Sequence, residues 1–246
     1  MPDSNGTTPA KTVEKEARAE TTSRPQREYR TLAFQVALLA ALGAFAVLTL
    51  MVSATPLFGI DLQITRALQA VSSPLFAMLM SLVSWPGFPP QSLIMTGFVA
   101  WLLYRYGLQW EAVTALFAAM LSGAVNLLVK ELIRRPRPTG DLVEVISILE
   151  SYSFPSGHVM FYVGFFGYLW FLVFTLLKSS WRRTLLLCLF GTLIVLVGPS
   201  RIYLGHHWAS DILGASLLGG VTLAMILQFY RWGKQRFFRR QPVAPG

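Results

Sequence analysis

Charged residues are scarce in this sequence, and cysteine is almost absent. Asp, Glu, Lys and Arg make up 13% of the 246 residues, whereas soluble domains carry about 25%. This shortage argues against an ordinary soluble globular domain. The single cysteine, Cys188, excludes an internal disulfide and a metal cluster built on cysteine.

Long apolar segments take the place of the missing charge, and hydrophobic residues make up 54% of the chain. Uncharged runs cover residues 31–60, 67–104, 112–129, 159–177, 184–200 and 212–230. A membrane-spanning helix needs about 20 mostly apolar residues, so all but one of these runs fit one helix each. The run 67–104 is the exception, because it is interrupted near its middle by Pro86, Gly87, Pro89 and Pro90.

The basic residues indicate how the helices are oriented. The net charge of +9 comes largely from Lys and Arg beside the apolar runs, and membrane orientation explains it without a nucleic-acid partner. Basic residues cluster before residue 31, in the loop 178–183 and after residue 230, which predicts that all three segments are cytoplasmic. An odd number of crossings must then join the run 31–60 to the run 112–129. We expect one crossing, at about Gln91–Tyr106.

The predicted fold is an all-α bundle of six transmembrane helices with its active site at the extracytoplasmic face. We expect residues 1–28 to form a disordered cytoplasmic tail, residues 29–232 the six-span domain and residues 233–246 a basic cytoplasmic tail. Residues 60–85 would form a partly amphipathic surface helix and a re-entrant or external segment. Four helix ends then face outward and contain Lys and Arg, against the positive-inside rule. An anionic ligand at that face would explain these cations.

Three segments at these helix ends contain residues suited to phosphate chemistry. The first contains Lys130 and Arg137, and Arg offers paired N–H donors to phosphate oxygens while Lys offers a point charge. The second contains Ser156, Gly157 and His158, where a helix start leaves free N–H groups for an anion and glycine admits close approach. Either segment alone also fits a basic membrane flank or a simple helix cap.

The third segment contains Arg201, His207 and Asp211. His207 and Asp211 are four residues apart and would share one helix face. The carboxylate could then fix the imidazole tautomer and leave the other ring nitrogen as a nucleophile. The alternative is an interfacial histidine with a capping aspartate. Since His206 and His207 would point in different directions and no His-Glu-x-x-His motif occurs, we expect no metal and no other cofactor.

Together the three segments resemble the signature of the type-2 phosphatidic acid phosphatase superfamily. The matching residues are Lys130-x6-Arg137-Pro138, Pro155-Ser156-Gly157-His158 and Ser200-Arg201-x5-His207-x3-Asp211. The resemblance implies a metal-independent six-helix membrane enzyme with a phosphohistidine intermediate. It makes His207 the nucleophile, Asp211 its orienting residue, and His158 the general acid and then the base. It assigns the binding of the phosphoryl oxygens to Lys130, Arg137, Ser156, Gly157 and Arg201.

The implied activity is hydrolysis of a lipid phosphate or isoprenyl diphosphate. Undecaprenyl diphosphate, phosphatidylglycerol phosphate, phosphatidic acid and a lipid A phosphate all fit. We expect the protein to lie in a bacterial inner (plasma) membrane with its site facing outside, and to meet lipids rather than nucleic acid or a protein partner. A lipid phosphotransferase and a vanadate-dependent haloperoxidase-like enzyme are the alternatives, although haloperoxidases resemble soluble helical proteins.

Three further residues near the signature have no role assigned by it. Arg134 and Arg135 could meet a second phosphate or a lipid head group, or they could be solvated charges. The role of His206 is equally open.

Overall fold

The computed structural model describes residues 9–237, with side chains described from residue 31 onward. In chain order the elements are α1 (Pro9–Ala54), α2 (Gly59–Gln69), α3 (Pro74–Ser84), the 3-10 turn η1 (Trp85–Gly87), α4 (Gln91–Arg105), α5 (Gln109–Ile133), α6 (Gly157–Phe161), the π-helical segment η2 (Tyr162–Phe166), α7 (Gly167–Leu176), α8 (Trp181–Tyr203) and α9 (Ala209–Phe237). Residues 9–237 contain no β-strand. The all-α prediction is therefore confirmed for the described part of the chain.

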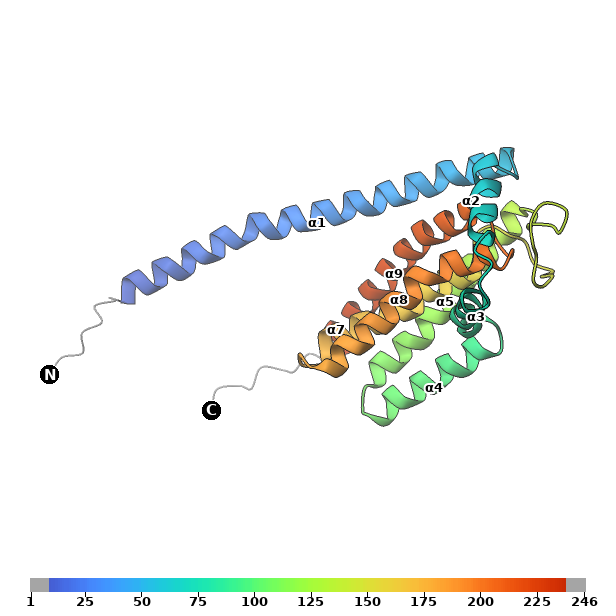
Figure 1. Ribbon diagram of the computed structural model, residues 1–246. Helices are drawn as coiled ribbons and strands as arrows, with labels where there is room; N and C mark the ends of the chain where they lie inside the picture. The colour runs from blue at the N-terminus through green and yellow to red at the C-terminus, as the bar shows by residue number, and fades with distance from the viewer. Residues whose placement is uncertain (1–8, 238–246) are drawn as a thin grey trace. The chain divides into compact units, whose positions relative to one another are not determined.

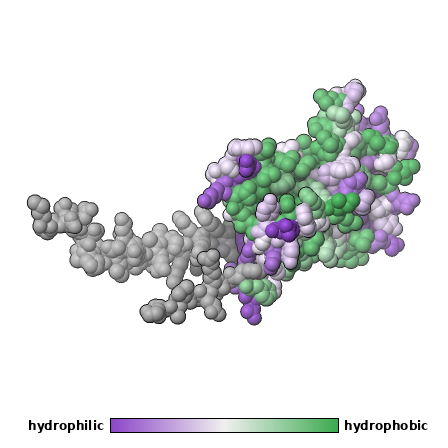
Figure 2. Space-filling model, turned by 90° about the horizontal axis from the view of Figure 1, so that it is seen from below, coloured by the Kyte–Doolittle hydropathy of each residue, from purple (hydrophilic) through white to green (hydrophobic). Residues whose placement is uncertain are grey.

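Within residues 9–237, five helical segments are long and apolar enough to cross a membrane. They are Thr31–Ala54, Gln109–Ile133, Gly157–Leu176, Trp181–Tyr203 and Ala209–Phe237, and they correspond to five of the six uncharged runs. Hydrophobic residues cover much of the face seen in Figure 2, and hydrophilic residues gather mainly toward its two ends. Such a surface suits contact with lipid. The expected sixth crossing corresponds to α4, whose 15 residues are fewer than a span ordinarily needs, so six crossings stay a prediction.

The chain divides into two units, residues 1–43 and residues 44–246. The described side chains of the first unit begin at Thr31 and are mostly exposed and apolar. The second unit contains the end of α1 and all other elements. Every residue of the candidate site belongs to this second unit.

The segment from α6 through η2 to α7 forms the centre of the second unit. Its most apolar stretch is 61% buried, a larger share than in the other four span candidates. Helices α5, α8 and α9 pack around it, while α4 packs on α5 and α3 on α8 (Figure 1). Close packing explains Gly164, because a Cβ there would lie 2.0 Å from Ser122 Oγ.

The candidate site lies at the end of the bundle at which α5 and α8 finish and α6 and α9 begin (Figure 1). Helix α5 ends at Ile133. Its C-cap residue Arg134 has a left-handed backbone (φ 52°) and turns the chain into the loop 134–156. Arg66 of α2 donates to Leu142 O at 3.2 Å, and Gln69 donates to Glu144 O at 2.7 Å. Helix α2 therefore holds this loop over the helix ends.

The two expected tails overlap only partly with the described residues. Helix α1 begins at Pro9, whereas we expected no helix before residue 29; residues 10–20 are rich in Ala, Glu, Lys and Arg, which favour helix. Helix α9 extends to Phe237, and the rest of the tail 233–246 lies outside the described residues. The domain boundaries and the cytoplasmic location of both tails stay predictions.

Candidate active site

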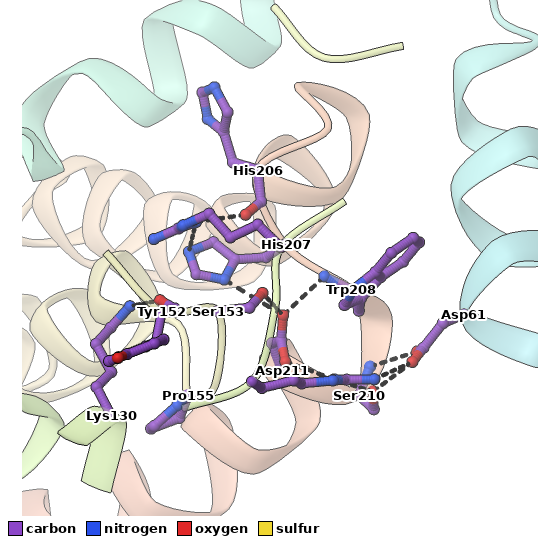
Figure 3. Close-up of polar contacts among 12 residues, drawn as sticks. Asp61, Lys130, Tyr152, Ser153, Pro155, His206, His207, Trp208, Ser210 and Asp211 are labelled. Carbon is purple, nitrogen blue, oxygen red and sulfur yellow. Dashed lines mark hydrogen bonds and ion pairs between the residues drawn. The ribbon is translucent and has the colours of Figure 1, made fainter. Parts of the chain in front are cut away.

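His207 lies at the centre of the cluster formed by the three predicted segments, in the short loop between α8 and α9 (Figure 3). Its side chain is buried. Nδ1 is 3.4 Å from Asp211 Oδ2, and Nε2 is 3.2 Å from Arg137 Nη1. Because a guanidinium can only donate, Nε2 carries the lone pair and the ring proton lies on Nδ1, toward Asp211. The nitrogen with nucleophilic character is therefore Nε2.

The Asp211 carboxylate is held at both oxygens. Oδ2 accepts hydrogen bonds from Trp208 N at 2.9 Å and from Ser153 Oγ (Figure 3). Oδ1 accepts from Arg135 Nη1 at 2.5 Å. We expected His207 and Asp211 on one helix face. In the structure only Asp211 is helical, in the first turn of α9, and His207 precedes that helix. The predicted pairing nevertheless occurs.

Burial and neighbouring cations keep the two adjacent histidines neutral. The pKa of His207 is lowered well below 6.5, first by burial and then by the charges of Arg137 and Lys130. Burial also lowers the pKa of His206 to about 3, with Arg201 and Arg137 acting in the same direction. The pKa of Arg137 itself falls to about 10 through burial, against the opposing effect of Asp211. Arg137 therefore remains a cation at neutral pH, and His207 remains an unprotonated base.

The three predicted phosphate-binding cations surround His207 and are anchored at their outer sides. Lys130 Nζ donates to Tyr152 O. Arg137 donates to Ser151 O at 2.6 Å and to His206 O at 2.5 Å. Arg201 Nη1 donates to Ser84 Oγ at 2.6 Å.

Arg201 keeps donors for a ligand. Its Nε and Nη2 are buried and have no hydrogen-bond partner among the described residues. Buried N–H groups without partners are uncommon and costly in proteins, and a phosphoryl oxygen would satisfy them. The Phe88 ring centroid lies 4.9 Å from the Arg201 guanidinium carbon, within the range of a cation–π contact.

The segment with Ser156, Gly157 and His158 begins α6 beside the same space. Ser156 is the N-cap residue, and its Oγ, like His158 Nε2, has no hydrogen-bond partner in the described part of the chain. A Cβ on Gly157 would lie 3.0 Å from Asn126 Oδ1, so the helix start approaches α5 closely. The Phe88 ring packs edge-on against His158 with centroids 4.5 Å apart.

A cavity of about 800 Å³ opens onto these side chains. Lys130, Arg137, His158, Arg201 and His207 line its polar end. Most of its remaining wall comes from apolar residues of α4 and α5. The cavity thus joins an end lined by basic residues to a hydrophobic groove.

The structure assigns contacts to the three basic or histidine side chains whose roles were open. Arg135 is fully buried and binds Asp61 and Asp211, so it is neither solvated nor directed at a second phosphate. Arg134 is exposed and lies 3.8 Å from Glu131. His206 Nε2 lies 2.8 Å from Ser147 Oγ.

Sequence reasoning missed Asp61, Ser84 and Phe88, which lie on segments without a motif. One signal was available: Asp61 is the only acidic residue between residues 31 and 104. As for metals, the described residues include no group of three or more His, Cys, Asp or Glu that could hold an ion. Metal independence itself stays a prediction.

A family model described as the PAP2 superfamily matches residues 111–235. The chain belongs to the PAP2 superfamily. Phosphatidylglycerophosphatase B of Bacillus subtilis (strain 168) is 32% identical over 128 residues, which are 52% of this chain and 62% of that protein. Human dolichyldiphosphatase 1 is 30% identical over 138 residues, covering 52% of this chain and 56% of the relative. The chain therefore spans less than two thirds of the length of these curated relatives.

The PAP2 fold extends beyond the matched region. A crystal structure of a transmembrane PAP2-type phosphatidylglycerolphosphate phosphatase from Bacillus subtilis superposes with a TM-score of 0.70 at 24% identity, covering 83% of this chain and 98% of the other. At this identity the likeness establishes the fold alone. With its apolar helices, it identifies the chain as an integral membrane protein of the PAP2 fold.

Proposed function

We propose that this PAP2 protein is a metal-independent phosphatase that hydrolyses a lipid phosphate or isoprenyl diphosphate through a phosphohistidine at His207. The observation that carries the proposal is the cavity, where the unprotonated His207 Nε2 lies among three cations at the end of an apolar groove. A phosphate monoester bound there would present its phosphorus to the imidazole and its hydrocarbon part to the groove.

The first half of the reaction forms the N–P bond. His207 Nε2 attacks phosphorus, the bond to the leaving oxygen breaks, and His158 donates a proton to that oxygen. Lys130, Arg137 and Arg201 stabilise the charge on the equatorial oxygens, together with the N–H groups at the start of α6. The Asp211 carboxylate stabilises the positive imidazole ring that results.

The second half breaks the N–P bond. His158, now neutral, accepts a proton from water, whose oxygen attacks phosphorus. The bond to Nε2 then breaks, inorganic phosphate leaves, and His207 returns to its neutral form. Both half-reactions use the same cations, and neither requires a metal ion.

The groove supports a lipid as the substrate. Its walls include Leu93 and Gly97 of α4 and Leu116 and Met120 of α5, whereas its cationic residues gather at one end. The family relatives named above are a phosphatidylglycerophosphatase and a dolichyldiphosphatase, which agrees with a lipid phosphate or diphosphate. Undecaprenyl diphosphate, phosphatidylglycerol phosphate, phosphatidic acid and a lipid A phosphate are the substrates to test.

The membrane arrangement that we propose has six crossings, with α4 as the sixth. Helix α4 packs along α5, and the turn between them lies at the end of the bundle away from the site (Figure 1). Arg105, at the end of α4, is then at the same membrane face as Lys178 and Arg182. This arrangement supports cytoplasmic termini and a site that faces outward in a bacterial inner membrane.

Phosphate release tests the proposal directly. Protein purified in detergent should release phosphate from at least one lipid of the panel in excess EDTA, and orthovanadate should inhibit it. The His207→Ala variant should lose several orders of magnitude in kcat, because the covalent nucleophile is gone. Arg134→Gln, which changes an exposed cation near the site, is the matched control and should retain wild-type turnover.

Three results would contradict the proposal. One is turnover by folded His207→Ala near the wild-type rate. Another is activity that EDTA abolishes and Mg²⁺ or Zn²⁺ restores. The third is transfer of the phosphate to a second lipid with none released to water, which would make the chain a phosphotransferase.

A further inference from the structure

A buried chain of charges extends from the nucleophile to α2. Arg135 Nη1 donates to Asp211 Oδ1 at 2.5 Å, and Arg135 Nη2 donates to Asp61 Oδ2 at 2.8 Å. All three side chains are at most 1% exposed. This row of buried side chains therefore leads from His207 through Asp211 and Arg135 to Asp61, without water access along its length.

Arg135 is oriented away from the phosphate-binding cations. Its Nε donates to Pro56 O at 2.8 Å, and its Nη1 also donates to Ser210 Oγ at 2.7 Å. These contacts, with the two carboxylates, occupy the guanidinium on every nitrogen. Arg135 is absent from the cavity lining, whereas Lys130 and Arg137 are part of it. It therefore cannot bind the phosphoryl group, and its partner toward the site is Asp211.

Asp61 fixes the start of the helix that carries Asp211. Its Oδ1 accepts from Ser210 N at 2.8 Å and its Oδ2 accepts from Ser210 Oγ at 2.6 Å. Figure 3 shows Asp61 pointing toward Ser210. Ser210 lies in the first turn of α9, next to Asp211. A carboxylate at this place caps free N–H groups and favours the helix start electrostatically.

The charges of Asp211, Arg135 and Asp61 matter for the reaction as well as for the geometry of the site. Asp211 must be negative when His207 becomes positive on phosphorylation. Arg135 alone would neutralise Asp211, because the two are in direct contact. Asp61 compensates for Arg135, so that two carboxylates and one guanidinium leave one net negative charge beside His207.

We propose that Asp61 and Arg135 are positioning residues that hold the Asp211 carboxylate against His207 and preserve its negative charge during phosphoryl transfer. This role rests on the proposed function. It predicts an effect on the chemical step rather than on substrate binding, because neither residue reaches the cavity.

The Asp61→Asn variant tests the role with little change in shape. Asparagine keeps an oxygen for Ser210 N. Its Nδ2 cannot accept from Arg135 Nη2 or Ser210 Oγ, and the compensating charge is removed. We expect kcat to fall about tenfold to a hundredfold, the range found when hydrogen-bond partners of metal-ligating histidines are removed, with KM within about threefold. Arg134→Gln is again the control, since that neighbouring arginine is exposed, and thermal unfolding in detergent reports the stability of each variant.

A charge-restoring double variant separates the electrostatic role from a purely structural one. Asp61→Asn combined with Arg135→Gln returns the trio to one net negative charge, although it loses more hydrogen bonds than the single variant. We expect kcat of the double variant to exceed that of Asp61→Asn, even with a lower melting temperature. A structural role predicts the reverse order, because each lost contact would add damage.

The outcomes decide between the two roles. Asp61→Asn with wild-type kcat, with a raised KM alone, or with a double variant that is slower still would overturn the positioning role while the wild type remains a phosphatase. A wild-type protein that hydrolyses no lipid of the panel would overturn the proposed function and this role with it.

Discussion

Replacing Gly87 by alanine should displace His158 and slow the protonation of the leaving group. A Cβ at residue 87 would lie 2.4 Å from His158 Cδ2 and 2.9 Å from its Cγ. Carbon atoms in contact are about 3.5–4.0 Å apart, so the ring must move by about 1 Å. The Phe88 ring also packs against His158, with centroids 4.5 Å apart, so the displaced ring cannot move freely.

A shift of this size in a catalytic group lowers the reaction rate by a known order of magnitude. A misplacement of about 1 Å costs about a hundredfold in rate, and general acid catalysis contributes about 10²–10⁴-fold in total. We therefore expect Gly87→Ala to lower kcat about a hundredfold on a lipid phosphate. With p-nitrophenyl phosphate the loss should shrink, because that leaving group departs readily without a proton.

The matched control is Gly220→Ala, where a Cβ would have no atom within 4 Å. Its kcat and its melting temperature should remain close to the wild-type values. Steady-state kinetics on both substrates, with unfolding curves for each variant, make the comparison. Equal losses on the two substrates, or a folded Gly87→Ala protein with full activity, would refute the assignment of His158 as general acid.

Two further predictions concern pH and topology. Burial and the charge of Arg137 lower the pKa of His207 well below 6.5, so protonation of this nucleophile should reduce kcat/KM only below that pH. Arg137→Gln removes one of these charges and should shift the acid side of the pH profile of kcat/KM to higher pH. Identical acid sides in the two proteins would contradict the electrostatic argument. Single cysteines at Thr139 and Ser179, introduced after Cys188 is replaced, should differ in intact cells: an impermeant thiol reagent should label position 139 but not 179. The opposite labelling would indicate a cytoplasmic site.

The three motif segments could be predicted from the sequence because each is a short continuous stretch of residues. Helix ends follow from uncharged runs, and the orientation of those runs brings Lys130, His158 and His207 to one end of the bundle. The structure places these residues together, as expected. The pairing of His207 with Asp211 was also predictable from spacing, although the helix starts only after His207.

The surroundings of the site could not be predicted, because they depend on how separate segments pack. Asp61 and Ser84 belong to segments with no motif, and their contacts bridge more than 100 residues of sequence. Arg134 and Arg135 are adjacent in sequence, yet one is exposed and the other buried. The left-handed backbone at Arg134 turns the chain between them, and no pattern in the sequence shows which arginine faces inward.

The shortness of α4 has a consequence for the bilayer beside it. Its 15 residues extend about 22 Å, whereas the 25 residues of α5 extend about 37 Å. If α4 crosses the membrane as proposed, local thinning of the hydrocarbon layer, ordinarily about 30 Å thick, is one way to match it. The thinned patch would adjoin the groove between α4 and α5, so lipids entering there would already carry their head groups deeper, toward the level of the cations. The protein would thus lower the substrate to the site by deforming the membrane rather than by extracting the lipid from it.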